Sequence, residues 1–229
     1  MKKLFSLLFI VTFLISCSKD SSSDSTPSLS DTPLAKAEFD SSNFGIYKGV
    51  IIGSTGIITI NIKNDGNLTA TLVIDGVTSV FTSNGNVALG EAINNLTFTS
   101  GDKSFTISVT ANGGDISVLS SNIPGHLDAT FNVIKEYSED LVTCYQGTYT
   151  GATDNGVFNL IFIDNELYGL SKSNSAESET NFLSGFLNTN VISGSFDTGT
   201  FTGNLSGNSV SGTWSVEETT GTWTGTRTL

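Results

Sequence analysis

The apolar residues downstream of residue 45 occur in short runs, and apolar and polar positions alternate within most of them. The runs are rich in Thr, Val, Ile and Phe, and Gly, Asn and Asp separate them. Side chains on a strand point to opposite faces in turn, so a period of two indicates half-buried β-strands. No segment has a helical period of useful length. The strands expected in the first half are 56–63, 67–74, 77–82, 95–100, 103–110, 116–120 and 126–135.

Tight turns are expected between these runs. Four segments combine residues that tolerate positive φ: Asn64-Asp65-Gly66-Asn67, Asp75-Gly76, Asn112-Gly113-Gly114-Asp115 and Asp154-Asn155-Gly156. Turns of this kind join antiparallel neighbours into hairpins. The pattern therefore predicts an all-β, antiparallel fold.

Residues 199–228 carry the most regular alternation. One face of the expected strands presents Phe201, Gly203, Leu205, Val210, Gly212, Trp214, Val216, Gly221, Trp223, Gly225 and Arg227, and the other is almost entirely Ser and Thr. Glycine normally weakens a strand, so its recurrence on the apolar face needs a reason. It leaves room for a ring from the neighbouring strand and permits strong coiling, as in a tightly curved sheet or small barrel. We expect Trp214 and Trp223 to fill these spaces.

A weak internal repeat divides the chain. Tyr47 and Tyr145 each begin a Tyr-x-Gly-x-x-x-Gly pattern that opens a series of expected hairpins. The favoured organisation is two related β units, 45–136 and 144–229, with a linker or short helix at 137–143; the alternative is one β domain, a barrel or sandwich, over 45–229. Antiparallel pairing of 221–228 with 144–151 would remove an exposed edge from the second unit.

Three C-terminal segments repeat Gly, Thr and an aromatic residue: GTFTG at 199–203, GTW at 212–214 and GTWTGTR at 221–227. They resemble strands of the lipocalin-like and transferrin-binding-protein-like barrels of surface lipoproteins, and this resemblance implies a strongly coiled up-and-down barrel. It carries no binding residue over to this chain. Arg227, the polar residue of the apolar face, has two interpretations. Its head reaches water over Trp223, or it is buried against a tryptophan and closes one end of the barrel.

The N-terminus has the layout of a secretory signal. Lys2 and Lys3 precede an apolar run, 4–15, that is too short to span a bilayer as a helix. The run ends in Leu14-Ile15-Ser16-Cys17, which resembles the lipobox of bacterial lipoproteins. The resemblance implies that 1–16 is a cleaved signal peptide and that Cys17 is acylated. We therefore expect a lipid anchor in the outer membrane of a bacterial envelope.

Residues 17–44 are expected to form the lipidated start of the mature chain and a disordered tether. Ser, Asp, Thr and Pro dominate most of this segment, which leaves little apolar surface to bury. Lys19-Asp20 partly resembles the acidic export signals of surface-exposed lipoproteins. We therefore expect exposure at the cell surface, with a periplasm-facing location as the alternative.

Charge and cysteine content restrict the partners. The chain has 10 basic and 22 acidic residues and a formal charge of −12. Nucleic acid would be repelled, and the expected contact with the membrane runs through Cys17 alone. Acylation of Cys17 leaves Cys144 as the only thiol, so no intramolecular disulfide is expected, and a buried, inert thiol is the default.

The sequence offers little catalytic chemistry. One histidine, His126, and no Cys-x-x-Cys or His-x-x-x-His spacing argue against a zinc site, and we expect neither metal nor cofactor. There is no Gly-x-Ser-x-Gly motif, and a Ser-His-Asp set would have to use His126. The acidic residues weighed as a carboxylate pair lie in polar runs that suggest solvated loops: Glu136, Glu139, Asp140, Glu177, Glu179, Glu217 and Glu218.

The combined features favour a non-enzymatic envelope lipoprotein that binds or scaffolds a protein or glycan partner. The alternative is a lipocalin-like carrier of a small apolar ligand, for which Trp214, Trp223 and Arg227 are candidate binding residues; a hydrolase is less favoured. The interior of the fold discriminates between the first two. A carrier needs a cavity of roughly a few hundred Å3, whereas in a scaffold the rings pack together. The sequence does not indicate the oligomeric state.

Overall fold

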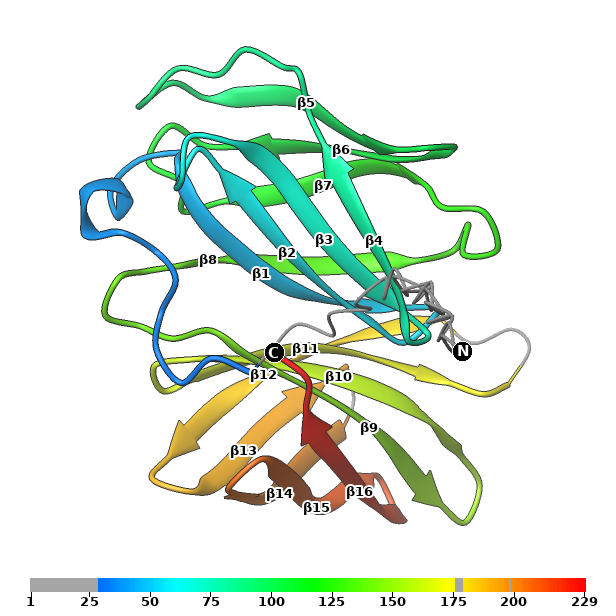
Figure 1. The fold of residues 1–229 in the computed structure, drawn as a ribbon. Helices are drawn as coiled ribbons and strands as arrows, with labels where there is room; N and C mark the ends of the chain where they lie inside the picture. The colour runs from blue at the N-terminus through cyan, green and yellow to red at the C-terminus, as the bar shows by residue number, and fades with distance from the viewer. Residues whose placement is uncertain (1–28, 176–178, 198) are drawn as a thin grey trace, which may run out of the picture.

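The computed structural model describes residues 29–175, 179–197 and 199–229. The expected signal peptide and Cys17 lie outside these residues. Within them the chain forms a short 3-10 helix, η1 (Ala37–Phe39), and sixteen strands, all paired antiparallel (Figure 1). The expected all-β, antiparallel fold class is therefore confirmed.

Two units of eight strands follow each other along the chain. The first contains β1 (Gly45–Ile52), β2 (Gly56–Ile62), β3 (Leu68–Ile74), β4 (Val77–Thr82), β5 (Ile93–Ser100), β6 (Lys103–Val109), β7 (Ile116–Asn122) and β8 (Thr130–Glu136). The second contains β9 (Thr143–Gly151), β10 (Asn155–Ile163), β11 (Glu166–Ser173), β12 (Thr180–Asn188), β13 (Val191–Phe196), β14 (Gly199–Ser206), β15 (Ser209–Val216) and β16 (Thr219–Arg227). Residues 137–142 connect them without a helix.

The first unit is one curled sheet in the order β7-β6-β5-β4-β3-β2-β1-β8. Its edge strands β7 and β8 lie beside each other without hydrogen bonding, so the sheet is nearly closed. A second weak seam lies between β4 and β5, which pair only at Thr82 and Thr99. The Asp75-Gly76 turn has φ of 49° and 78°, as its hairpin requires. Inside the curl lies a core that includes the stacked rings of Phe98 and Phe105.

Two local expectations, one in each unit, are wrong. β8 begins at Thr130 and not at 126, because residues 123–129 form turns closed by backbone bonds from His126 to Ile123 and from Ala129 to His126. The Asp154-Asn155-Gly156 turn is also shifted, since β10 already begins at Asn155.

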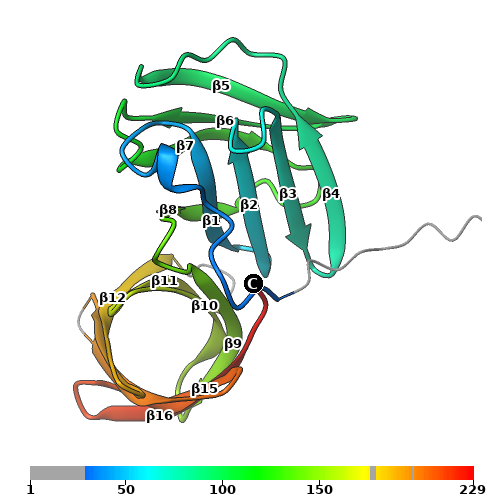
Figure 2. The same ribbon diagram turned by 60° about the vertical axis from the view of Figure 1, so that its left-hand side comes forward.

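The second unit is a closed barrel in the order β10-β11-β12-β13-β14-β15-β16-β9 (Figure 2). Consecutive hairpins supply all pairings except the last, in which β16 returns to β9. That pairing runs from Gly221 opposite Gly151 to Arg227 opposite Tyr145. The closure expected from the sequence is therefore confirmed, and it removes both sheet edges.

The glycines of the barrel interior make room for rings, as expected. A Cβ on Gly212 would lie 2.7 Å from the Trp223 ring, and a Cβ on Gly203 would overlap the same ring. Gly221, on the strand adjacent to Trp214, and Gly151, one strand further on, both lie against the Trp214 ring. Each large ring thus fills the space that its glycine neighbours leave, which is how a strongly coiled small barrel reaches close packing.

The two units share an apolar interface. β1 packs across the outer wall of the barrel at β9, β10 and β11, as the arrangement in Figure 2 illustrates. The interface contains buried residues from both units: Val50, Ile52, Ile57, Val142, Cys144, Ile161, Leu170 and Leu229. Asn159 donates to the carbonyl of Ile51 across it, at 2.6 Å. Both faces of β1 and β10 are covered, which matches the nearly uninterrupted apolar sequence of these two strands.

A buried ion pair lies beside this interface. Lys48 on β1 and Glu136 at the end of β8 are in direct contact, and their side chains are 2% and 0% exposed. The Glu136 carboxylate also accepts from the backbone N–H groups of Leu34, at 2.7 Å, and Val142, at 3.1 Å. The expected placement of Glu136 in a solvated loop is therefore wrong. The carboxylate joins the first unit to the inter-unit linker and to the N-terminal segment.

Residues 29–44, expected to belong to the tether, contact both units instead. Lys36 donates its backbone N–H to Asn64 on the first unit, and the Lys135 ammonium donates to three backbone carbonyls, those of Phe39, Ser42 and Phe44. Phe44 also packs against the core of the first unit, so this segment is held by hydrogen bonds of its backbone and by apolar contact. The remainder of the expected tether, residues 17–28, lies outside the described part of the chain.

Arg227 fits neither of its two interpretations completely. Its side chain is 7% exposed, so its head does not reach water. Its guanidinium does not lie over a tryptophan; it pairs with Asp31 at 2.9 Å and donates to the carbonyls of Ser30 and Leu229. Arg227 therefore fixes the N-terminal segment to the barrel.

Candidate functional site: the open end of the barrel

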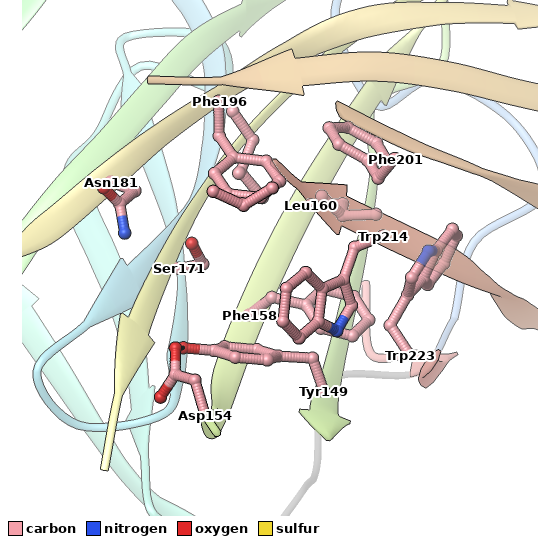
Figure 3. A pocket seen from close by; sticks show the side chains of 12 residues that line it. Tyr149, Asp154, Phe158, Leu160, Ser171, Asn181, Phe196, Phe201, Trp214 and Trp223 are labelled. Atoms are coloured by element: carbon pink, nitrogen blue, oxygen red, sulfur yellow. Dashed lines mark hydrogen bonds between the residues drawn. The ribbon is translucent and has the colours of Figure 1, made fainter. Parts of the chain in front are cut away.

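The closed barrel contains a cavity of about 100 Å3 at the end where β9 turns into β10, β13 into β14 and β15 into β16 (Figure 3). Its lining is mostly aromatic and aliphatic: Tyr149, Phe158, Leu160, Leu183, Phe196, Phe201, Trp214, Val216 and Trp223, with Asp154, Ser171 and Asn181 as the polar members. Tyr149, Asp154, Phe196 and Val216 are half-buried, so the cavity opens to solvent at this end.

The opposite end of the barrel is filled. Tyr145 and Phe162 meet edge to face there, with ring centroids 5.3 Å apart, and Leu167 and Val210 pack in the same cluster. The barrel interior is therefore a cup with one open end. We call the open-end cavity the barrel cup.

Aromatic rings form the wall of the barrel cup by edge-to-face contacts. Trp223 meets Phe158 at 5.5 Å and Phe201 at 6.1 Å between ring centroids, and Trp214 meets Tyr149 at 6.0 Å. Each such contact stabilises its pair by about 0.5–1.5 kcal/mol beyond burial, so the wall is held in one arrangement.

A polar cluster lies at the mouth of the cup. The Tyr149 hydroxyl donates to the Asp154 carboxylate at 3.0 Å, and the Ser173 hydroxyl donates to the other carboxylate oxygen at 2.6 Å. Burial, and then the hydrogen bond to Asp154, raise the pKa of Tyr149 above its ordinary value. The phenol consequently remains a donor at neutral pH and holds the carboxylate beside the cavity.

The two indole N–H groups of the cup differ. Trp223 donates to the carbonyl of Thr213 at 3.1 Å. The Nε1 of Trp214 is buried and has no hydrogen-bond partner among the described residues. A buried donor without an acceptor costs about 1–3 kcal/mol, and the Trp214 N–H is such an unsatisfied donor in the cup wall.

The structure brings two of the three candidate ligand-binding residues together. Trp214 and Trp223 both line the cup, whereas Arg227 lies at the filled end of the barrel, on the segment that pairs with Tyr145. Sequence reasoning did not propose Tyr149, Asp154 or Phe158. The period-two pattern could have placed Phe158, which is opposite Gly147 in the register, but Asp154 has the sequence context of an ordinary turn residue.

His126 does have a serine and a carboxylate nearby. Ser54 Oγ is 2.5 Å from His126 Nδ1, and Asp75 lies 3.9 Å from the same nitrogen. A Ser-His-Asp relay needs the serine and the carboxylate on different ring nitrogens, because the imidazole must pass a proton between them. This group therefore lacks relay geometry. The absence of catalytic activity stays a prediction.

The Cys144 thiol is not activated for catalysis either. Cys144 is fully buried, and burial raises the pKa of its thiol to about 12, so it is protonated at neutral pH.

Residues 29–175, 179–197 and 199–229 contain no group of three or more His, Cys, Asp or Glu side chains suited to a metal ion. In the same part of the chain, no helix has the length and apolar character to cross a membrane.

Replacing Tyr149 with phenylalanine is expected to make folding less sensitive to alkaline pH. Because the folded-state pKa is raised, the folded protein keeps the phenol proton at a pH at which the unfolded chain releases it. Stability from this group is therefore complete below about pH 10 and is lost above it, by up to about 1.4 kcal/mol per pH unit. Melting temperatures between about pH 9 and 11 should fall less steeply for Tyr149→Phe than for the wild type. Parallel curves would contradict the assignment.

Comparisons of the chain with protein-family models, with curated proteins and with solved structures gave no match.

Proposed function

We propose that this protein is a non-enzymatic, lipid-anchored binding module of a bacterial envelope, and that its barrel cup receives a ring-sized group at the tip of a protein or glycan partner. The cup carries the proposal: a rigid aromatic wall and a fixed carboxylate surround one opening. Such a combination of apolar lining and few polar groups is typical of a recognition site.

The size of the cup favours this function over a lipocalin-like carrier. Its volume of about 100 Å3 is well below the roughly 300 Å3 at which pockets begin to enclose whole small molecules. A closed cavity of about 150 Å3 accommodates benzene, so the open cup has room for most of one ring. A partner would therefore insert one terminal group and keep its remaining surface outside the barrel.

The location of the module is also a proposal. The Leu14-Ile15-Ser16-Cys17 motif supports acylation of Cys17 and anchoring in the outer membrane. The Lys19-Asp20 pair supports exposure at the cell surface, where a protein or glycan partner is accessible. The formal charge of −12 favours neutral or basic partners over anionic ones.

Blocking the mouth of the cup should abolish binding of ring-sized probes. In the full chain carrying Cys17→Ser, phenol and p-cresol are expected to bind with millimolar affinity and to change the fluorescence of Trp214 and Trp223. Val216→Phe adds a ring at the rim of the cup and should remove this response. Thr213→Phe, on the exposed face of the same strand, is the matched control and should retain it. Equal responses of both variants, or none from the wild type, would refute the proposed site.

A further inference from the structure

A second concave site lies on the outer wall of the barrel, over β11, β12 and β13, and has a volume of about 300 Å3. Six side chains on this wall line it: Glu166, Tyr168, Ser184, Phe186, Ser193 and Ser195. We call it the outer groove. Figure 2 shows β12 in the side wall of the ring, next to β11, which contacts the first unit.

Strand register arranges these side chains in a grid. Phe186 on β12 lies between Glu166 on β11 and Ser193 on β13. In the adjacent row, Ser184 lies between Tyr168 and Ser195. The neighbouring positions Leu167, Leu183 and Ile192 belong to the barrel core, so all six side chains of the grid point outward.

The ring at the centre of this grid is exposed. Phe186 is 64% exposed and Phe182, two outward positions earlier on β12, is 65% exposed, whereas Phe158, Phe162 and Phe201 are buried in the core. Four residues along a strand span about 13 Å, so the two rings form a line along β12 longer than one sugar ring. Two large rings exposed in one line along a strand, beside a concave site, form a candidate interaction surface.

Polar groups flank the exposed ring on both sides. The Tyr168 hydroxyl donates to the Glu166 carboxylate, which is thereby oriented beside Phe186. The serine hydroxyls of β12 and β13 can both donate and accept. An apolar ring face next to a carboxylate and several hydroxyls matches a pyranose, whose C–H face is apolar and whose hydroxyls lie around its edge. A purely apolar partner would leave the carboxylate and the hydroxyls unpaired.

Charge restricts the class of glycan further. Glu166 lies within the groove and the chain carries a formal charge of −12, so uronic-acid or sulfated glycans would be repelled. We propose that the outer groove, continued along β12 to Phe182, is a binding site for a neutral glycan chain, with Phe186 stacked on one sugar ring and Phe182 on another. The site is separate from the barrel cup and does not depend on the function proposed for it.

Affinity gel electrophoresis tests the proposal directly. The full chain carrying Cys17→Ser is run through native gels that contain neutral soluble polysaccharides (a β-glucan, a xylan, a galactomannan and an α-glucan) or anionic polygalacturonate. At least one neutral polysaccharide should retard the protein and polygalacturonate should not. Phe186→Ala should weaken the retardation at least about tenfold, as truncation of a central contact residue does. Phe186→Trp, which keeps a stacking surface, should preserve it.

Two control variants test whether glycan binding is confined to the outer groove. Val80→Ala removes an apolar side chain of similar exposure, 60%, from the first unit and should have no effect. Val216→Phe, which blocks the barrel cup, should also leave retardation unchanged. Retardation by none of the neutral polysaccharides, or equal retardation of Phe186→Ala and the wild type, would overturn the proposal. So would a dimer that Phe186→Ala dissociates, because the exposed rings would then be an interface between copies of this chain.

Discussion

Replacing Glu136 with alanine is expected to lower the free energy of unfolding by about 3–5 kcal/mol. The substitution leaves the Lys48 ammonium buried without its carboxylate, and among the described residues the carbonyl of Val142, at 3.4 Å, is its remaining acceptor. It also removes the acceptor of two backbone N–H groups, those of Leu34 and Val142. A buried charge without a partner is far more costly than the absence of the whole pair, so the loss should be close to the top of this range.

The surface pair of Lys36 and Glu38 is the matched control. Its side chains are 53% and 64% exposed, and the charged groups are 4.0 Å apart. Glu38→Ala should therefore change stability by less than about 0.5 kcal/mol. Urea denaturation of both variants measures the difference. Replacing both members of the buried pair, as Lys48→Met with Glu136→Leu, should recover part of the loss, because no unpaired charge remains. A loss below about 1 kcal/mol for Glu136→Ala would show that water reaches Lys48.

The second large effect is expected from Trp223→Ala, which should destabilise the protein by about 3–5 kcal/mol. The indole is 6% exposed, meets Phe158 and Phe201 edge to face, and donates its N–H to Thr213. Its removal leaves a void beside two glycines, Gly203 and Gly212, that have no side chains with which to fill it. Thr224→Ala, on the outward face of the same strand, should cost less than about 0.5 kcal/mol.

A double-mutant cycle separates the loss of the ring from its fit to glycine. Gly212→Ala alone should cost at least about 1–3 kcal/mol, because its Cβ would overlap the backbone of β14 and would also lie 2.7 Å from the Trp223 ring. In the Trp223→Ala background the same substitution should cost less, since the ring contact is gone while the overlap with β14 remains, and the coupling should exceed about 0.5 kcal/mol. Denaturant unfolding measures the loss in free energy of unfolding for each variant. Strict additivity of the two single losses would mean that glycine is required here only because the neighbouring backbones approach closely.

The interior of the barrel was predictable because its pattern is local. Alternation along 199–227 places Phe201, Trp214 and Trp223 on one face, and the structure buries all three. The closure of β16 on β9 also follows from a local argument, since an even number of consecutive strands joined by hairpins can bring the last beside the first in antiparallel order.

The contacts that sequence reasoning missed join residues far apart in the chain. Glu136 pairs with Lys48 across 88 positions, and Arg227 reaches Asp31 across 196. Nothing in the residues next to Glu136 indicates that it is buried, because the burial comes from β1, the linker and the N-terminal segment together. Asp154 likewise has the neighbours of a turn residue, and only the curvature of the barrel places it beside Tyr149 and the cup.

Neighbouring residues and a period of two were enough to predict an antiparallel all-β protein in two units, the buried face of each C-terminal strand, and the glycines that accommodate rings. Three further properties come from the folded arrangement: the first unit packs on the barrel wall, one end of the barrel is filled while the other remains a small cup, and two phenylalanines of β12 lie uncovered. These properties depend on sheet curvature and on contacts between distant segments, which no local pattern encodes.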